Sequence, residues 1–161
     1  MKNIAILGLG NIANRVAKGV LCSEKASLYA VASRKIETAK SFAEKYGTVV
    51  YYGSYEEMLK DSNVDLVYIC TPNTFHYEQI KLCLSYGKHV ICEKPMVKNE
   101  EQVREIFALA REQGCFLMEA EKTMFTPLNN KIKEMIAEGE IGKLHTIRAQ
   151  YCSEGLDGLP E

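Results

Sequence analysis

The fold is decided near the start of the chain, in the stretch Ile4-Ala5-Ile6-Leu7-Gly8-Leu9-Gly10-Asn11-Ile12-Ala13. Its first four residues are apolar and predict a short buried strand, and apolar residues then recur at helical spacing at Ile12, Val16 and Val20. A strand that passes through Gly-x-Gly-x-x-Ala directly into a helix is typical of dinucleotide-binding proteins. The stretch therefore predicts a nucleotide site at the first strand-to-helix turn, with an ordinary tight turn as the alternative.

The small residues of this turn have separate physical roles in the prediction. Gly8 permits the tight turn, Gly10 lets the backbone approach a pyrophosphate, and Ala13 keeps the helix close to the strand. The free N–H groups of Asn11 and Ile12, at the start of the helix, are expected to face the phosphates. We therefore expect Gly8, Gly10, Asn11 and Ile12 to bind a dinucleotide cofactor.

Short apolar runs alternate along the chain with segments of helical period. One helical segment ends at Gly47, and another follows Asn99, an expected N-cap with Gln102 three residues on. Continuous apolar strands between helices are typical of a parallel sheet covered on both faces. We therefore predict an α/β fold with a doubly wound parallel sheet over residues 1–120. The expected strands are Ile4–Leu7, Leu28–Ala32, Val49–Tyr52, Leu66–Cys70, His89–Cys92 and Phe116–Met118.

The pattern changes after residue 120. Leu128, Ile132 and Ile136 follow helical spacing, and Leu144–Tyr151 alternates like a strand with one buried face. A lone strand of this kind is marginal and needs partners. We therefore interpret residues 121–161 as a linker and the first helix and strand of a second, truncated α/β domain.

The composition excludes several classes of protein. With 47% hydrophobic and 25% charged residues the chain is an ordinary globular one, and 20 basic against 21 acidic residues argue against a nucleic-acid partner. No apolar run approaches the roughly 20 residues of a membrane span, and no signal peptide is recognisable, so we expect no membrane partner and a cytoplasmic location. The six cysteines contain no Cys-x-x-Cys pair, which predicts buried free thiols and no metal site.

The end of the second expected strand bears on the choice of cofactor. NAD sites place an Asp or Glu there to hold the ribose 2′-hydroxyl, but this chain has Ser33-Arg34-Lys35. A hydroxyl and two cations can accept a 2′-phosphate, and Arg34 offers a planar fork of donors. We therefore favour NADP(H), bound by Ser33 and Arg34, with NAD(H) as the alternative. The two cations could also simply be solvated at the start of the next helix.

Two further strand ends carry polar residues on the edge of the sheet where ligands bind in open α/β folds. The fourth strand ends in Cys70-Thr71-Pro72-Asn73-Thr74-Phe75-His76 and the fifth in Cys92-Glu93-Lys94-Pro95. Lys94, preceded by a carboxylate and followed by a proline, can be held over a cofactor and exchange a proton. A solvated turn lysine is the alternative, and a hydrogen-bonded structural histidine is the simpler interpretation of His76 alone.

Together these motifs resemble the Gfo/Idh/MocA family, which is named after glucose-fructose oxidoreductase, inositol dehydrogenase and a protein of rhizopine catabolism. The resemblance covers almost the whole chain, and several motifs in the right order are more specific than the glycine pattern alone. The matching stretches are residues 8–13, 32–34, 71–76, 87–95, 116–120 and 141–144.

The resemblance implies a Rossmann domain that binds NAD(P), joined to an α/β domain that forms the substrate site and, in the full-length protein, the interface of a homo-oligomer. It implies that Lys94 is the catalytic lysine, beside the nicotinamide and the substrate hydroxyl or carbonyl. The resemblance places the remaining motif residues beside the nicotinamide and its ribose, with His76 supporting that loop; these residues are Thr71, Pro72, Asn73, His76 and Glu93. Glu119 ends the next strand on the same edge.

The chain departs from the family pattern in two places. Met124 stands where many members have an arginine, which puts contacts of that arginine in doubt, and the family's Asp and His of the second domain have no counterpart before Glu161.

The leading hypothesis is thus the cofactor-binding part of an NAD(P)-dependent dehydrogenase or reductase that acts on a sugar, cyclitol or related hydroxy or carbonyl compound. Such a fragment is expected to be inactive alone. The alternative is a non-catalytic nucleotide-binding sensor that is complete as it stands, and a third hypothesis has a separate chain supply the missing domain.

Overall fold

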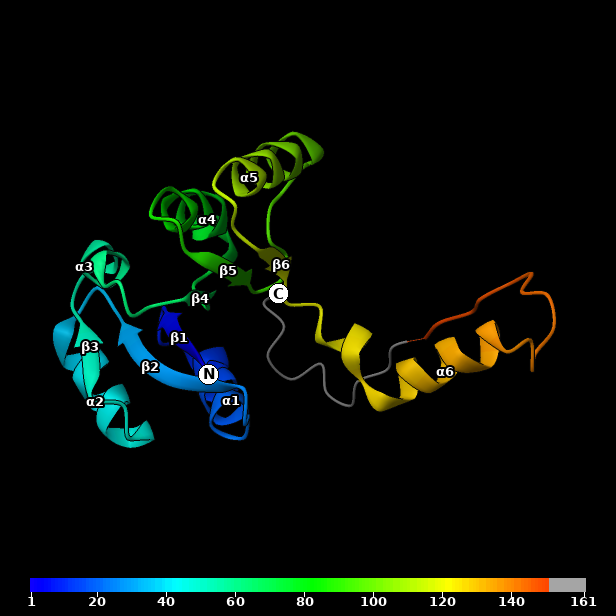
Figure 1. Ribbon diagram of the computed structural model, residues 1–161, viewed down its shortest axis with the longest axis horizontal. Helices are drawn as coiled ribbons and strands as arrows, with labels where there is room; N and C mark the ends of the chain where they lie inside the picture. Colours follow the sequence, from blue (N-terminus) through cyan, green and yellow to red (C-terminus); the bar gives the residue numbers. More distant parts are fainter. Residues whose placement is uncertain (151–161) are drawn as a thin grey trace, which may run out of the picture. The chain divides into compact units, whose positions relative to one another are not determined.

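The computed structural model describes residues 1–150 of the chain, which divides into two compact units, Met1–Glu121 and Lys122 onward (Figure 1). The first unit is an α/β domain with a six-stranded sheet of order β3-β2-β1-β4-β5-β6. Every neighbouring pair of strands is parallel. The strands are β1 (Lys2–Leu7), β2 (Ala26–Ala32), β3 (Val50–Tyr52), β4 (Leu66–Ile69), β5 (His89–Cys92) and β6 (Leu117–Glu119). The predicted doubly wound parallel sheet is therefore confirmed.

Alternate residues of each strand point to opposite sides of the sheet. Because both sets are apolar and buried, helices cover the sheet on both faces. Ala5 and Leu7 of β1 belong to a core shared with α3 (Tyr55–Lys60), α4 (His76–Ser85) and α5 (Glu100–Glu112). Ile6, between them, belongs to a second core shared with α1 (Asn11–Leu21) and α2 (Ile36–Tyr46). Figure 1 shows α3, α4 and α5 along one side of the strands and α1 and α2 along the other.

The helix boundaries follow local chemistry. Asn99 Oδ1 accepts a hydrogen bond from the Gln102 amide at 2.9 Å, so the predicted cap of α5 is confirmed. Helix α2 ends at Gly47, whose φ of 71° lies in the left-handed region that favours glycine. The short helix α3 was not predicted from the sequence; it starts after Ser54, whose hydroxyl accepts from the Glu57 amide.

The second unit holds a short 3-10 turn (Lys122–Phe125) and α6 (Pro127–Ala137), capped by the Thr126 hydroxyl. The predicted helix is confirmed. The expected strand Leu144–Tyr151 is not formed over residues 144–150, and Tyr151 lies outside the described residues. A strand needs a neighbour for its main-chain groups, and the described part of the chain supplies none for this segment.

The cysteines mostly follow expectation. Cys70, Cys83 and Cys92 are buried free thiols and Cys115 is half-buried, but Cys22 is exposed at the end of α1, contrary to prediction. Cys152 lies outside the described residues. None of the helices formed by residues 1–150 has the length and apolar character that crossing a membrane requires.

Candidate functional site

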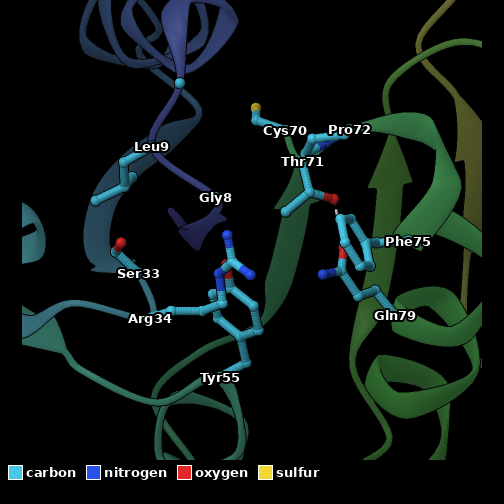
Figure 2. A pocket seen from close by; sticks show the side chains of 11 residues that line it. Gly8, Leu9, Ser33, Arg34, Tyr55, Cys70, Thr71, Pro72, Phe75 and Gln79 are labelled. Carbon is cyan, nitrogen blue, oxygen red and sulfur yellow. Dashed lines mark hydrogen bonds between the residues drawn. The ribbon is translucent and has the colours of Figure 1, made fainter.

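A cavity of about 390 Å³ lies where β1, β2 and β4 end at the carboxyl edge of the sheet. Figure 2 shows side chains from these strand ends, from α3 and from α4 around the same space. This is the position at which open α/β sheets bind ligands, since the chain connections diverge there to opposite faces. The lining residues are Gly8, Leu9, Gly10, Ser33, Arg34, Tyr55, Cys70, Thr71, Pro72, Phe75 and Gln79.

The glycine turn forms one wall, and its two glycines are required for different reasons. Gly8 has a φ of 88°, and a Cβ placed on it would lie 2.5 Å from Thr71 Cγ2 and 3.0 Å from the Thr71 amide nitrogen. Gly8 thus lets the turn pack against the loop that follows β4. A Cβ on Gly10 would meet nothing within 4 Å, so the space beside this residue is open. An approaching ligand could therefore reach the backbone of Gly10, which is the N-cap of α1.

A cationic corner forms the second wall. Ser33 follows β2, and its amide donates to Tyr52 O at 3.1 Å, which ties this corner to β3. Arg34 forms no ion pair within residues 1–150, and none of the eleven lining residues is acidic. Burial raises the pKa of Tyr55 by more than the charge of Arg34 lowers it, so the Tyr55 hydroxyl stays protonated at neutral pH. The corner therefore presents hydrogen-bond donors and a positive charge.

The loop after β4 forms the third wall. Thr71 Oγ1 donates to Gln79 Oε1, which fixes the threonine against the first turns of α4. Cys70 is 5% exposed, and burial, followed by the nearby Glu93 carboxylate, raises the pKa of its thiol. The thiol is therefore neutral and acts as a small apolar side chain at the base of the cavity.

His76 joins the loop after β4 to the loop after β5. Its side chain is 1% exposed, and its two ring nitrogens lie 2.9 Å from Thr71 O and 2.9 Å from Pro95 O. A neutral imidazole donates from one nitrogen only, and the tautomer decides which of the two carbonyls receives that bond. His76 therefore lies between the carbonyls of Thr71 and Pro95, where it can donate to one of them, and it is not a lining residue of the cavity.

The loop that carries Lys94 is held from both ends. Tyr68 Oη donates to Glu93 Oε1 at 3.0 Å, and the amide of Met96 donates to Glu119 Oε1 at 2.7 Å. Burial is the main cause that raises the pKa of Tyr68, and the charge of Glu93 raises it further, so the tyrosine is the donor of this bond. The Lys94–Pro95 peptide bond is cis.

The structure separates the predicted site residues into two groups. One group lines the cavity: Gly8, Gly10, Ser33, Arg34, Thr71 and Pro72. The other group, Asn11, Ile12, Asn73, His76, Glu93 and Lys94, lies outside that lining, at the start of α1 and in the loops that follow β4 and β5.

Sequence reasoning did not single out five lining residues: Leu9, Tyr55, Cys70, Phe75 and Gln79. Gln79 could have been found from its position one helical turn after His76, because residues three apart in a helix share one face. No local pattern marks Tyr55.

The fold and the cavity define a dinucleotide-binding protein of the Rossmann type. Residues 2–121 match the family model described as "Oxidoreductase family, NAD-binding Rossmann fold" (GFO_IDH_MocA). The chain therefore belongs to the Gfo/Idh/MocA family of oxidoreductases.

Named relatives extend this likeness. The chain is 43% identical over 148 residues to trans-1,2-dihydrobenzene-1,2-diol dehydrogenase of Mus musculus, which covers 91% of this chain and 44% of the relative. It is 38% identical to the Xenopus laevis protein of the same name, over 91% of this chain and 45% of that relative. The chain thus spans less than half the length of these relatives.

Solved structures show the same fold. KijD10, a 3-ketoreductase from Actinomadura kijaniata in complex with NADP, superposes with a TM-score of 0.80 at 33% identity, over 88% of this chain and 45% of that one. An NAD binding oxidoreductase from Klebsiella pneumoniae gives a TM-score of 0.76 at 34% identity, over 88% and 40%.

Proposed function

We propose that this chain is the cofactor-binding part of an NADP(H)-dependent oxidoreductase. The observation that carries the proposal is the cavity in which the open face of Gly10 lies with Arg34 and no acidic residue. A carboxylate at this corner would repel a 2′-phosphate, whereas a guanidinium can bind it through two parallel hydrogen bonds. The NADP complex of KijD10 supports the same preference.

The residues present fit the two ends of such a cofactor. Ser33 and Arg34 would hold the 2′-phosphate, and the backbone from Gly8 to Ile12 would approach the pyrophosphate. Thr71, Pro72 and Asn73 follow the neighbouring strand β4 and would lie toward the nicotinamide ribose.

The chemistry divides between cofactor and protein. When bound, the nicotinamide accepts or gives the hydride. Lys94 takes the hydroxyl proton when an alcohol is oxidised, and returns a proton to the oxygen when a carbonyl is reduced, so charge and protons balance in both directions. The bond from Tyr68 to Glu93 and the contact of His76 with Pro95 would keep the Lys94 loop in place.

We infer a substrate with a hydroxyl or carbonyl group on a ring, such as a sugar or cyclitol. The names of the relatives support this class, because one acts on a cyclic trans-diol and another is a 3-ketoreductase. Residues 121–161 would be the linker and the start of the substrate domain. Two observations support this assignment: the first compact unit ends at residue 121, and apolar residues of α6 are exposed, among them Leu128 at 70% exposure.

Fluorescence titration with NADPH and NADH tests the cofactor proposal. We expect NADPH to bind more tightly than NADH, and Arg34→Ala to weaken NADPH by about tenfold, the loss of one or more hydrogen bonds to a charged group, while NADH changes little. Arg111→Ala, in the last turn of α5 and away from the cavity, is the control. Absence of binding by either cofactor would refute the proposal, and tighter NADH binding would refute the NADP(H) preference alone.

A further inference from the structure

The loop from Glu93 to Met96 ends on a residue of the neighbouring strand. In the register of β5 and β6, Cys92 pairs with Glu119, and the amide of Ala120 donates to Cys92 O at 2.8 Å. Glu119 therefore lies beside the residue at which the Lys94 loop begins. Its carboxylate also accepts the amide of Met96, where the loop ends.

This contact is a strong one for a strand end. The distance from Met96 N to Glu119 Oε1 is 2.7 Å, which is typical of a hydrogen bond to an ionised carboxylate. Met96 is 6% exposed and belongs to the core packed against α4 and α5, so its amide is held on a rigid part of the domain. A bond of this kind fixes the far end of the loop relative to β6.

The three anchors of the loop come from three different elements. Tyr68 of β4 donates to Glu93, Glu119 of β6 accepts from the Met96 amide, and His76 of α4 places a ring nitrogen 2.9 Å from Pro95 O. Of the residues from Glu93 to Met96, only Lys94 is contacted by none of these three anchors. The loop can then be fixed in place while the lysine side chain stays available.

We propose that Glu119 is a positioning residue, which holds the Lys94 loop so that it contacts the nicotinamide half of the cofactor. The proposal rests on the proposed function, since it assumes that the cofactor lies along this edge with its nicotinamide toward β5. Neither the family match nor the names of the relatives assigns Glu119 a role. A loop that shifts by about an ångström loses much of what correct positioning contributes.

Binding measurements on the 161-residue chain test this proposal without turnover. NADPH reaches the nicotinamide side, whereas 2′,5′-ADP occupies only the phosphate and adenosine side. For Glu119→Ala we expect NADPH affinity to fall by about fivefold, a loss of the size that one ordinary hydrogen bond contributes, and 2′,5′-ADP affinity to stay within about twofold. Glu119→Gln keeps an oxygen acceptor for the Met96 amide and is expected to restore NADPH affinity to within about twofold of the original chain.

The controls separate positioning from folding. Glu112→Ala, at the end of α5 and outside the anchors, is expected to bind both ligands normally. The proposal is overturned if Glu119→Ala leaves NADPH affinity unchanged, or if it weakens the binding of both ligands alike. It is also overturned if Glu119→Gln fails to restore NADPH affinity, or if the original chain binds NADPH no more tightly than 2′,5′-ADP. A chain that binds neither ligand would instead refute the proposed function.

Discussion

The two halves of the site are built in different ways. Around β1 and β2 the site consists of the glycine turn, with an open space beside Gly10, and of one arginine that has no carboxylate partner in residues 1–150. Around β4, β5 and β6 the loops are tied together by side chains: Tyr68, His76 and Glu119 each bind a neighbouring loop.

The difference follows from what each half has to do. Phosphates are bound by N–H groups and positive charge, and a side chain at Gly10 would fill the space they need. A lysine that exchanges a proton must be held at one place, and side-chain hydrogen bonds to its loop supply that constraint. We therefore expect changes in the first half to alter the binding of the phosphate and adenosine side of the cofactor, and changes in the second half to alter binding at the nicotinamide side and turnover.

Replacing Lys94 gives the largest expected effect and changes only the second half of the site. In a form of the protein that includes the substrate domain, Lys94→Ala is expected to lower kcat about a thousandfold, because general acid–base catalysis contributes in this range. Cofactor affinity is expected to stay nearly unchanged, as measured by fluorescence titration. Retained turnover would show that another group exchanges the proton.

Replacing His76 tests whether the second half depends on its side-chain bonds. His76→Ala leaves the carbonyls of Thr71 and Pro95 without this partner and opens space beneath them, so we expect the free energy of unfolding to fall by about 3 kcal/mol. Urea denaturation measures this change, with His145→Ala, at an exposed position of the second unit, as the control. An unchanged free energy of unfolding would mean that the two loops keep their places without the histidine.

The glycine turn gives a sharper contrast within the first half. Gly10→Ala fills open space, so the chain is expected to keep its stability but bind NADPH about tenfold less tightly, through lost backbone hydrogen bonds. Gly8→Ala strains a left-handed residue against Thr71 and is expected to lower the unfolding temperature. Gly19→Ala, in α1 with nothing near its Cβ position, controls for the added methyl group. Equal affinity of Gly10→Ala and the original chain would place the ligand away from this turn.

The smallest expected effect concerns the hydrogen bonds of Asp61 with residues of β2 and β3, the strands beside the first half of the site. Burial raises the pKa of Asp61. Hydrogen bonds from the Asn63 amide and from the Tyr52 and Tyr29 hydroxyls lower this pKa by more than burial raises it, so it lies below its ordinary value of 3.8. The folded carboxyl binds its proton less readily than the unfolded one, so this network stabilises the fold above pH 3.8 and loses that contribution as the pH falls through the folded pKa.

Asp61→Asn is expected to make the unfolding free energy less dependent on pH in that acidic range. Denaturation between neutral and acidic pH measures it. The prediction is wrong if the variant and the original chain lose stability in parallel.

Much of the fold could be predicted because its signals are local. The apolar runs of the strands, the cap at Asn99 and the left-handed Gly47 act over a few residues, and each appears where expected. The expected strand at Leu144–Tyr151 fails over residues 144–150 because its pattern could be satisfied only by partner strands from elsewhere. Tyr55 was missed because its place in the cavity depends on how α3 packs, not on its neighbours in sequence.

The sequence by itself determined the glycine turn, the cationic end of β2 and the lysine after β5, since a turn, a charge and a proton-exchanging group are properties of residues and short stretches. The tertiary structure alone decided which of these meet. The strand order brings the ends of β1, β2 and β4 around one cavity, and the pairing of Cys92 with Glu119 brings a carboxylate to the Lys94 loop. Both depend on contacts between residues far apart in the chain, which are fixed only when the helices pack on the sheet.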